Sequence, residues 1–322
     1  MTTSLDGPTA GPSGPTLRVT KGHGTENDFV LLADPDGALD LDAPLVRALA
    51  DRRAGLGGDG VIRLVRSTQL PQGRAALERD GSAEWFMDYR NGDGSVAEMC
   101  GNGVRVAARF AEDLGVWDGR GSFALATRAG VRHVRKVDPP RGCSGEWYAV
   151  DMGPWRVVGG PAALERGGDV EVRVAGLPVA RPGLSVDVGN PHTVVVVADE
   201  ATLAGIDLTG TPRVDPEPPS GTNVELVVPL GEAPGESGPV GRVRMRVHER
   251  GVGETRSCGT GACAAAMAVA AWAGPSAPST WLVDVPGGTV RVRSLERGRV
   301  ELAGPAVLVA RAEVDLTALR GA

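Results

Sequence analysis

The segment 247–275 reads VHERGVGETRSCGTGACAAAMAVAAWAGP and contains the pattern Cys-Gly-x-Gly directly ahead of an alanine-rich stretch. A second segment, 95–115, reads SVAEMCGNGVRVAARFAEDLG and repeats this order around Cys100. Both stretches that follow the glycines have the composition of a helix. The two segments therefore predict the same corner twice, with Cys100 and Cys258 each at the start of a helix.

The spacing of the two corners favours an internal duplication. The cysteines lie 158 residues apart in a chain of 322 residues, which is close to half its length. Several short apolar runs precede each corner. We expect an α/β (α+β) fold of two pseudo-symmetric halves, each a curved, barrel-like mixed sheet around one central helix. Chance recurrence of a short glycine motif is the alternative, and the half-chain spacing argues against it.

Apolar runs broken by glycine and aspartate predict the strands. A further helix is predicted over 42–55, with Asp42 as its N-cap, Pro44 in the first turn and Gly55 as its stop. Two segments rich in proline, glycine and acid, 212–223 and 229–241, are predicted as surface loops. The strands are expected within 17–21, 28–34, 60–66, 85–91, 123–130, 146–153, 170–176, 184–199, 222–230, 241–251, 279–286, 288–295 and 299–316.

Composition excludes several classes of partner. The net charge is −6, so no basic field favours nucleic acid or an anionic membrane. The longest apolar helical run, 262–273, is too short to span a bilayer. Residues 1–16 lack the pattern of a signal peptide and are expected to form a disordered leader. Four cysteines in a chain of this length favour a reducing, cytoplasmic location.

The domain organisation follows from the repeated corner. We expect a first domain over 17–144, which carries Cys100 and is completed by 304–322, and a second domain over 145–303, which carries Cys258.

A cysteine at a helix N-terminus faces unpaired backbone N–H groups and the positive end of the helix dipole. Both favour the thiolate, so its pKa is expected below the free value of about 8.5. Two such corners related by a pseudo-twofold axis would place two thiols on opposite sides of one cleft. Inversion of a carbon stereocentre needs this arrangement, with a base on one face and an acid on the other. The Gly-Asn-Gly and Gly-Thr-Gly segments would supply N–H groups to a carboxylate.

The alternatives to an acid–base role for the cysteines are a structural thiol, a disulfide and a metal site. Cys143 and Cys263 are expected to be structural thiols. A disulfide between Cys100 and Cys258 is conceivable, but it would be an oxidation product in a reducing compartment. Zinc or another metal is not expected, because no paired metal-ligand spacing occurs. No cofactor is expected, and a Schiff-base mechanism would have only two lysines, Lys21 and Lys136.

Several motifs together resemble the diaminopimelate epimerase family. They are KGHGTENDFV, NGDGSVAEMCGNGVR, GNPHTVV and HERGVGETRSCGTGACAA, and the resemblance extends from Leu17 to Glu313. It implies two similar α/β domains, a homodimer, and cofactor-independent interconversion of LL- and meso-diaminopimelate on the route to lysine and peptidoglycan.

The resemblance also implies residue roles. Cys100 and Cys258 would be the paired acid and base. Glu249 and His192 would lie near the thiols, where they orient the reacting ammonium group or tune the proton transfers. The substrate-binding residues implied in this way are Asn27, Asn91, Gly101, Asn102, Asn190, Asn223, Glu249, Arg250, Gly259 and Thr260.

Two features of the chain depart from the family pattern. Gly60 stands where some members carry glutamine, so no side-chain contact is expected there, and the proline-rich stretch near Pro216 is longer than expected.

A proline or hydroxyproline racemase of the same fold typically has Cys-Gly-His-Gly at the first corner, where this chain has Cys-Gly-Asn-Gly. A phenazine-pathway-like isomerase would not need both thiols, and neither would an amino-acid-binding module.

Overall fold

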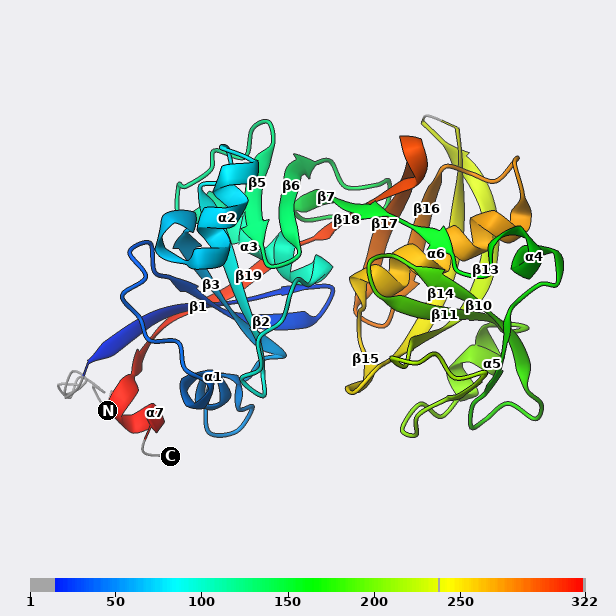
Figure 1. Ribbon diagram of the computed structural model, residues 1–322, viewed down its shortest axis with the longest axis horizontal. Coiled ribbons are helices and arrows are strands. Elements are labelled where there is room, and N and C mark those ends of the chain that lie inside the picture. Colours follow the sequence, from blue (N-terminus) through cyan, green and yellow to red (C-terminus); the bar gives the residue numbers. More distant parts are fainter. Residues whose placement is uncertain (1–14, 237, 321–322) are drawn as a thin grey trace, which may run out of the picture.

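The computed structural model describes residues 15–236 and 238–320, which form two halves lying side by side (Figure 1). The leader predicted over 1–16 lies outside the described residues, except that β1 already begins at Thr16. No helix in the described ranges is long and apolar enough to cross a membrane.

The first half is a ring of strands around one helix. Its strands are hydrogen-bonded in the order β19-β1-β2-β3-β4-β5-β6-β7-β18, and the ring closes because β18 runs directly into β19. The elements are β1 (Thr16–Gly24), β2 (Asn27–Ala33), α1 (Ala43–Ala50), β3 (Gly60–Arg66), α2 (Pro71–Arg79), β4 (Trp85–Asn91), α3 (Gly101–Asp113), β5 (Phe123–Thr127), β6 (Gly130–Val137), β7 (Trp147–Pro154), β18 (Arg299–Pro305), β19 (Val307–Asp315) and α7 (Leu316–Arg320).

The second half repeats this plan, with the strand order β8-β10-β11-β13-β14-β16-β17-β18-β7. Its elements are β8 (Arg156–Val157), α4 (Gly160–Glu165), β9 (Val170–Arg173), β10 (Arg181–Asp187), β11 (Pro191–Val196), α5 (Glu200–Gly205), β12 (Arg213–Asp215), β13 (Asn223–Gly235), β14 (Gly238–Glu249), β15 (Gly253–Thr255), α6 (Gly259–Ala273), β16 (Thr280–Val285) and β17 (Gly288–Leu295).

The pairing pattern matches between the halves. Parallel pairs occur at β2–β3 and β4–β5 in the first half and at β11–β13 and β14–β16 in the second. The central helix follows the fifth strand of the order given above in each case, as α3 after β4 and as α6 after β14 and the short β15. Strands β7 and β18 occupy equivalent places and pair with each other, so they join the two rings. The predicted fold of two sheets wrapped around central helices is confirmed.

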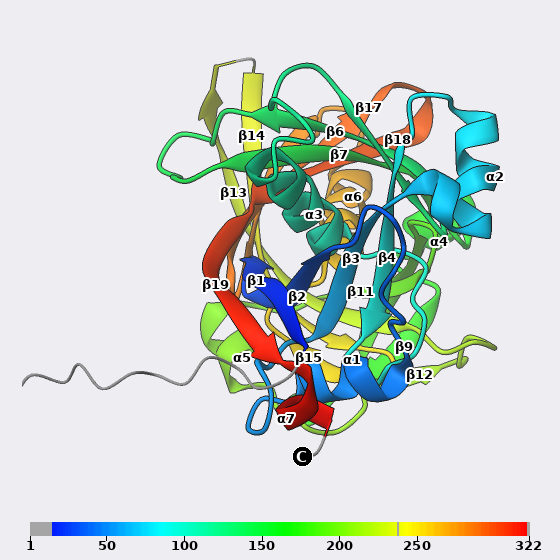
Figure 2. The ribbon, with the colours of Figure 1, turned by 90° about the vertical axis from the view of Figure 1, so that its left-hand side faces the viewer.

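Helix α6 is buried because its side chains are small or apolar on nearly every face, whereas α3 also carries Asn102, Arg105, Arg109, Glu112 and Asp113. Figure 2 shows α3 surrounded by strands of the first half. Ten residues of α3 and ten of α6 are buried, and eight of the fifteen residues of α6 are alanine. Alanine lets the strands approach the helix axis closely, and side chains from both helices share one apolar core.

Two local predictions need correction. Helix α1 begins after Asp42 as predicted, and the Asp42 carboxylate accepts from Leu45 N at 2.8 Å, but the helix ends at Ala50 and not at Gly55. A Cβ on Gly55 would overlap the Ala48 carbonyl, so the glycine allows the chain to fold back there. The segment 229–241 is not a loop: its described residues form the exposed ends of β13 and β14, which pair as a hairpin.

Candidate active site

The two predicted corners have the same geometry. Cys100 is the N-cap of α3, and its Sγ accepts a hydrogen bond from Gly103 N at 3.5 Å. Cys258 is the N-cap of α6, and its Sγ accepts from Gly261 N at 3.3 Å. Both cysteines have extended backbone, so each side chain folds back over the first turn of its helix.

The N-termini of the two helices meet. A Cβ placed on Gly259 would lie 3.4 Å from Cα of Gly101 and 3.5 Å from the backbone nitrogen of Asn102. The same Cβ would lie 2.9 Å from Leu302 Cδ2, so a glycine is needed at this position. Two sets of free N–H groups therefore point toward one region, which is where an anion would be bound.

A cavity of about 1150 Å³ covers this region and is lined by residues of both halves. Both thiols belong to its wall, and sequence positions that are far apart converge there. The predicted residues that line it are Asn27, Asn91, Cys100, Gly101, Asn102, Asn190, Glu249, Arg250, Cys258, Gly259 and Thr260.

Asn223 and His192 lie behind this wall. Asn223 Oδ1 accepts from the backbone nitrogen of Arg250 at 2.9 Å, and Asn223 Nδ2 donates to Pro191 O at 3.0 Å. His192 Nε2 lies 2.9 Å from Asn190 Oδ1. Both side chains therefore hold wall residues in place and do not themselves line the cavity.

The predicted lowering of the thiol pKa values is wrong. Burial raises the pKa of Cys100 to about 11, although the N–H of Gly103 acts in the opposite direction. Burial also raises the pKa of Cys258 well above its ordinary value, and the charges of Glu249 and Glu225 add to this effect. Loss of water around the sulfur outweighs the helix dipole, so both cysteines are neutral thiols at neutral pH.

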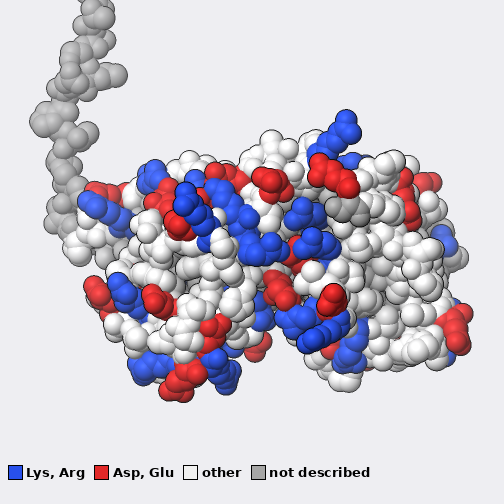
Figure 3. All heavy atoms as spheres, turned by 90° about the horizontal axis from the view of Figure 1, so that it is seen from above, with Lys and Arg blue, Asp and Glu red and all other residues white. Residues whose placement is uncertain are grey.

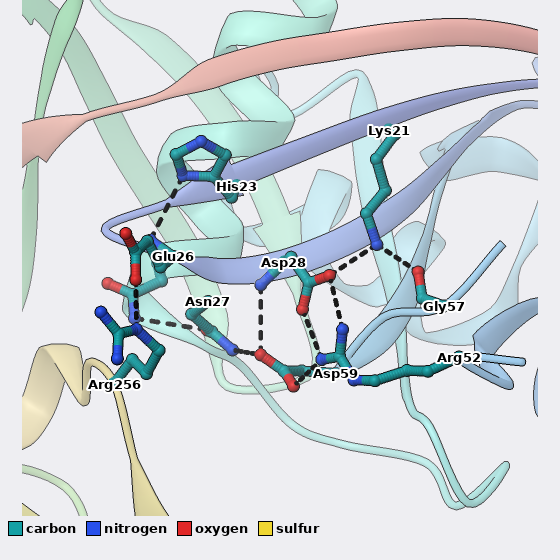
Figure 4. Close-up of polar contacts among 10 residues, drawn as sticks. Lys21, His23, Glu26, Asn27, Asp28, Arg52, Gly57, Asp59 and Arg256 are labelled. Carbon is teal, nitrogen blue, oxygen red and sulfur yellow. Dashed lines mark hydrogen bonds and ion pairs between the residues drawn. The ribbon is translucent and has the colours of Figure 1, made fainter. Parts of the chain in front are cut away.

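Asn27 connects the first thiol to Asp59, a carboxylate that the sequence did not single out, and Figure 4 shows the contact between Asn27 and Asp59. Its Nδ2 donates to Asp59 Oδ2 at 2.6 Å, and Asp59 also pairs with Arg52 at 2.7 Å. Its Oδ1 accepts from Cys100 Sγ at 3.5 Å and from Asn102 Nδ2 at 3.3 Å. Asp59, which directly precedes β3, therefore supplies the group that fixes the Asn27 amide.

Two carboxylates stand on the side of the second thiol. Glu249 accepts a hydrogen bond from Thr255 Oγ1, and burial raises its pKa. Glu225 is fully buried and pairs with His192 Nδ1 at 2.7 Å. A Cβ on Gly261 would lie 2.7 Å from Glu225 Oε1, which places this carboxylate against the first turn of α6. The alternating strand pattern around Glu225 gave no sign that it faces inward to this point.

Arg250 lies where the proline-rich segment folds against the wall. Its Nη1 donates to Ser220 O, and a Cβ on Gly221 would lie 3.0 Å from Arg250 Cδ. The segment therefore packs along the arginine stem.

Gly60 leaves no space for a side chain. A Cβ at this position would overlap the Arg90 carbonyl and lie 2.6 Å from Tyr89 Cε2. Tyr89 lines the cavity and was not among the predicted residues. Burial raises the pKa of Tyr89, and the charges of Asp59 and Glu249 act in the same direction.

The other cysteines take no part in the site. Cys263 is fully buried inside α6, and Cys143 lies in a turn between β6 and β7. All four cysteines are free. Within 15–236 and 238–320, no group of three or more His, Cys, Asp or Glu side chains is arranged to hold a metal ion.

Comparison with known proteins decides the family. The profile of diaminopimelate epimerase matches residues 19–158 and 184–309. The chain belongs to the diaminopimelate epimerase family. Members from Streptomyces coelicolor and Thermobifida fusca are each 49% identical to it, over 94% of this chain and over 96% and 100% of their own lengths. The member from Mycolicibacterium smegmatis is 43% identical over 92% of this chain and 96% of its own length.

Solved structures extend the likeness of fold beyond the family. A phenazine biosynthesis protein of the PhzF family from Bacillus anthracis superposes with a TM-score of 0.64 at 15% identity, over 93% of this chain and 99% of its own. A hydroxyproline epimerase from Agrobacterium vitis gives a TM-score of 0.58 at 15% identity, over 94% of this chain and 93% of its own. At this identity the likeness concerns the fold alone.

Proposed function

We propose that this chain interconverts LL- and meso-2,6-diaminopimelate by proton transfer at one α-carbon, with Cys100 and Cys258 as the two acid–base groups. The observation that carries the proposal is the meeting of two cysteine-capped helix N-termini at one cavity. An α-proton is removed from one face and replaced on the other, so two groups on opposite faces are needed. Family membership supports the choice of substrate.

The N–H groups at both corners would bind the carboxylate next to the reacting carbon. Removal of the α-proton delocalises negative charge onto that carboxylate, and donors already aimed at it stabilise the transition state. These donors would be the backbone N–H groups of Gly101, Asn102, Gly259 and Thr260.

The distal amino-carboxylate end would be held by polar groups farther along the wall. Asn91, Asn190 and Arg250 line the cavity and fit this role, with the guanidinium suited to a carboxylate. Asn223 and His192 act through Arg250 and Asn190, since their hydrogen bonds lead to these residues.

Substrate binding would also bring one thiol into its active form. Burial favours the neutral form of both thiols. The substrate carries an ammonium group on the reacting carbon, and a positive charge beside a thiol lowers the thiol pKa. Glu249 would accept the ammonium group near Cys258. We further propose that the halves close on the substrate and exclude water, which strengthens these charge interactions.

The remaining expectations belong to the same proposal. The enzyme needs no cofactor or metal, acts in the cytoplasm and forms a homodimer. Its domains are 17–144 completed by 304–322, and 145–303. Figure 3 shows acidic and basic side chains mixed over one face, with basic ones gathered over the junction of the halves. A small zwitterion, with two carboxylates and two ammonium groups, fits this distribution better than an extended polyanion does.

Proton exchange in D2O, followed by NMR, tests the proposal. LL-diaminopimelate and proline are incubated separately with the wild type, Cys100→Ala and Cys258→Ala, without added cofactor. Deuterium entry with meso-isomer formation on diaminopimelate alone, lost in both variants, is the expected result. Exchange only with proline would move the assignment to a proline racemase. No exchange with either substrate would leave a binding protein, and the proposal would fall.

A further inference from the structure

Arg105 is a buried cation without a carboxylate partner. It lies on α3 one turn after Gly101, is 0% exposed, and is among the largest fully buried side chains of the described residues. Its side-chain hydrogen bonds go to Gly101 and Asn102, and no carboxylate pairs with it in the described ranges. An unpaired buried charge is costly, so a fold keeps one only where an opposite charge compensates it at some stage.

The surroundings make space for the guanidinium. A Cβ on Gly304 in β18 would lie 3.1 Å from Arg105 Nε, and a Cβ on Gly24 in β1 would lie 3.2 Å from Arg105 Nη2. Alanine at either position would crowd the charged group. The arginine therefore occupies a fitted space behind the first corner and does not line the cavity itself.

Hydrogen-bond direction then fixes the first corner. A guanidinium can only donate, so Asn102 Oδ1 must face Arg105, at 2.8 Å from Nη2. The Asn102 amide nitrogen consequently points the other way and donates to Ser257 O at 3.0 Å, beside the second thiol. It also donates to Asn27 Oδ1 at 3.3 Å, the same oxygen that accepts from Cys100 Sγ at 3.5 Å.

We infer that Arg105 is a positioning residue of the two-thiol site: it fixes the Asn102 amide between the two corners and supplies a positive charge, from behind the first corner, to the bound carboxylate and the Cys100 thiolate. The inference rests on the proposed function, in which a substrate carboxylate is bound at these helix N-termini. The bound carboxylate would compensate the charge of the buried guanidinium. In an interior of low dielectric constant such an attraction is strong.

Other charged and polar groups also act on Cys100. Tyr89 on β4 and Glu249 at the end of β14 belong to the same cavity wall, and Asn27 on β2 accepts from its sulfur. Burial and the charge of Glu249 raise the Cys100 pKa, whereas N–H groups and the charge of Arg105 lower it. Removing the guanidinium should therefore raise this pKa further.

Two substitutions separate the charge from the hydrogen bonds. Arg105→Met removes both, and Arg105→Lys keeps the charge but loses the planar fork that holds Asn102 and Gly101. Alkylation of Cys100 by iodoacetamide is measured against pH without substrate, by mass spectrometry of the Cys100 peptide. The Met variant is expected to show a midpoint about one pH unit higher, and the Lys variant the wild-type midpoint. In both, kcat for diaminopimelate should fall about tenfold or more, with KM changed much less.

Arg109→Met is the matched control, since Arg109 lies one turn later on α3 and pairs with Glu146 at 3.1 Å. It should retain the wild-type midpoint and kcat. A folded Met variant with an unshifted midpoint and unchanged kcat would overturn the inference. If that variant does not fold, an unchanged kcat in the Lys variant would overturn it. The alkylation shift needs no substrate, so it is measured independently of the proposed activity, whose own failure would appear as wild-type inactivity on diaminopimelate.

Discussion

Gly101 and Gly259 face each other where α3 and α6 begin, so closely that a Cβ on Gly259 would lie 3.4 Å from Cα of Gly101. Each glycine follows a capping cysteine. This contact makes a single anion-binding region out of two helix N-termini. The close approach depends on the absence of a side chain.

Gly259→Ala is therefore expected to separate the corners. The added methyl would meet Leu302 Cδ2 at 2.9 Å and would displace one helix terminus by a fraction of an ångström. Such a shift misaligns donors and thiols, and we expect kcat/KM to fall about tenfold to a hundredfold. Steady-state kinetics check this. Gly210→Ala is the control because a Cβ there meets nothing within 4 Å. Equal activity of both variants would show that the contact is not required.

The buried thiols predict a loss of stability at alkaline pH. Burial raises the pKa of Cys263 to about 12, whereas an unfolded cysteine titrates near 8.5. The folded protein thus binds more protons than the unfolded chain between these values, and its stability falls as pH rises above about 8.5. Cys263→Ala should reduce this fall, by about 1.4 kcal/mol at pH 9.5. Urea unfolding at pH 7.5 and 9.5 measures it.

Cys143→Ala is the control for this prediction, since its thiol lies in a turn and is only partly buried. It should change the pH dependence less than Cys263→Ala does. The same slope in the wild type and in Cys263→Ala would contradict the assignment.

Glu249→Gln should lower the pKa of Cys258. Burial is the main cause of the raised pKa, and the charge of Glu249 is the next. Without that charge the thiolate is favoured, so iodoacetamide should modify Cys258 about threefold faster or more at pH 8, while epimerisation falls. Glu254→Gln, which removes a carboxylate paired with Arg246 at 2.7 Å, should leave the rate unchanged. Slower modification in the Glu249 variant would reverse the assigned direction.

Gly60→Ala tests the shape of the cavity wall. Its Cβ would overlap the Arg90 carbonyl and crowd Tyr89 Cε2 at 2.6 Å, and backbone cannot yield as a flexible side chain can. We expect a loss of about 1–3 kcal/mol in unfolding free energy and a displaced Tyr89 phenol. Thermal unfolding measures the first effect. Gly81→Ala, where a Cβ meets nothing within 4 Å, should be nearly neutral, and equal melting temperatures would contradict the argument.

Much of the fold could be predicted because its signals are local. The capping of α1 by Asp42, the helices after Cys100 and Cys258 and most strands follow from residue types within a few positions of each other. The inferred duplication led to the further prediction that the two corners lie at one cleft. The prediction of a loop over 229–241 was wrong, since turn-forming residues can extend a hairpin when a partner strand is in register.

The sequence by itself predicted the two cysteine–glycine corners that meet at one cavity, because each corner lies within a short motif. Only the tertiary structure decided the protonation state of the thiols and the position of Asn223 and His192 behind the cavity wall. It also decided which further residues belong to the site or support it: Asp59, Tyr89, Glu225 and Arg105. These properties depend on burial and on strand register, which bring together groups far apart in the sequence, such as Asn102 and Ser257, which are 155 residues apart. Desolvation and hydrogen-bond direction exist only after that packing, so no local pattern records them.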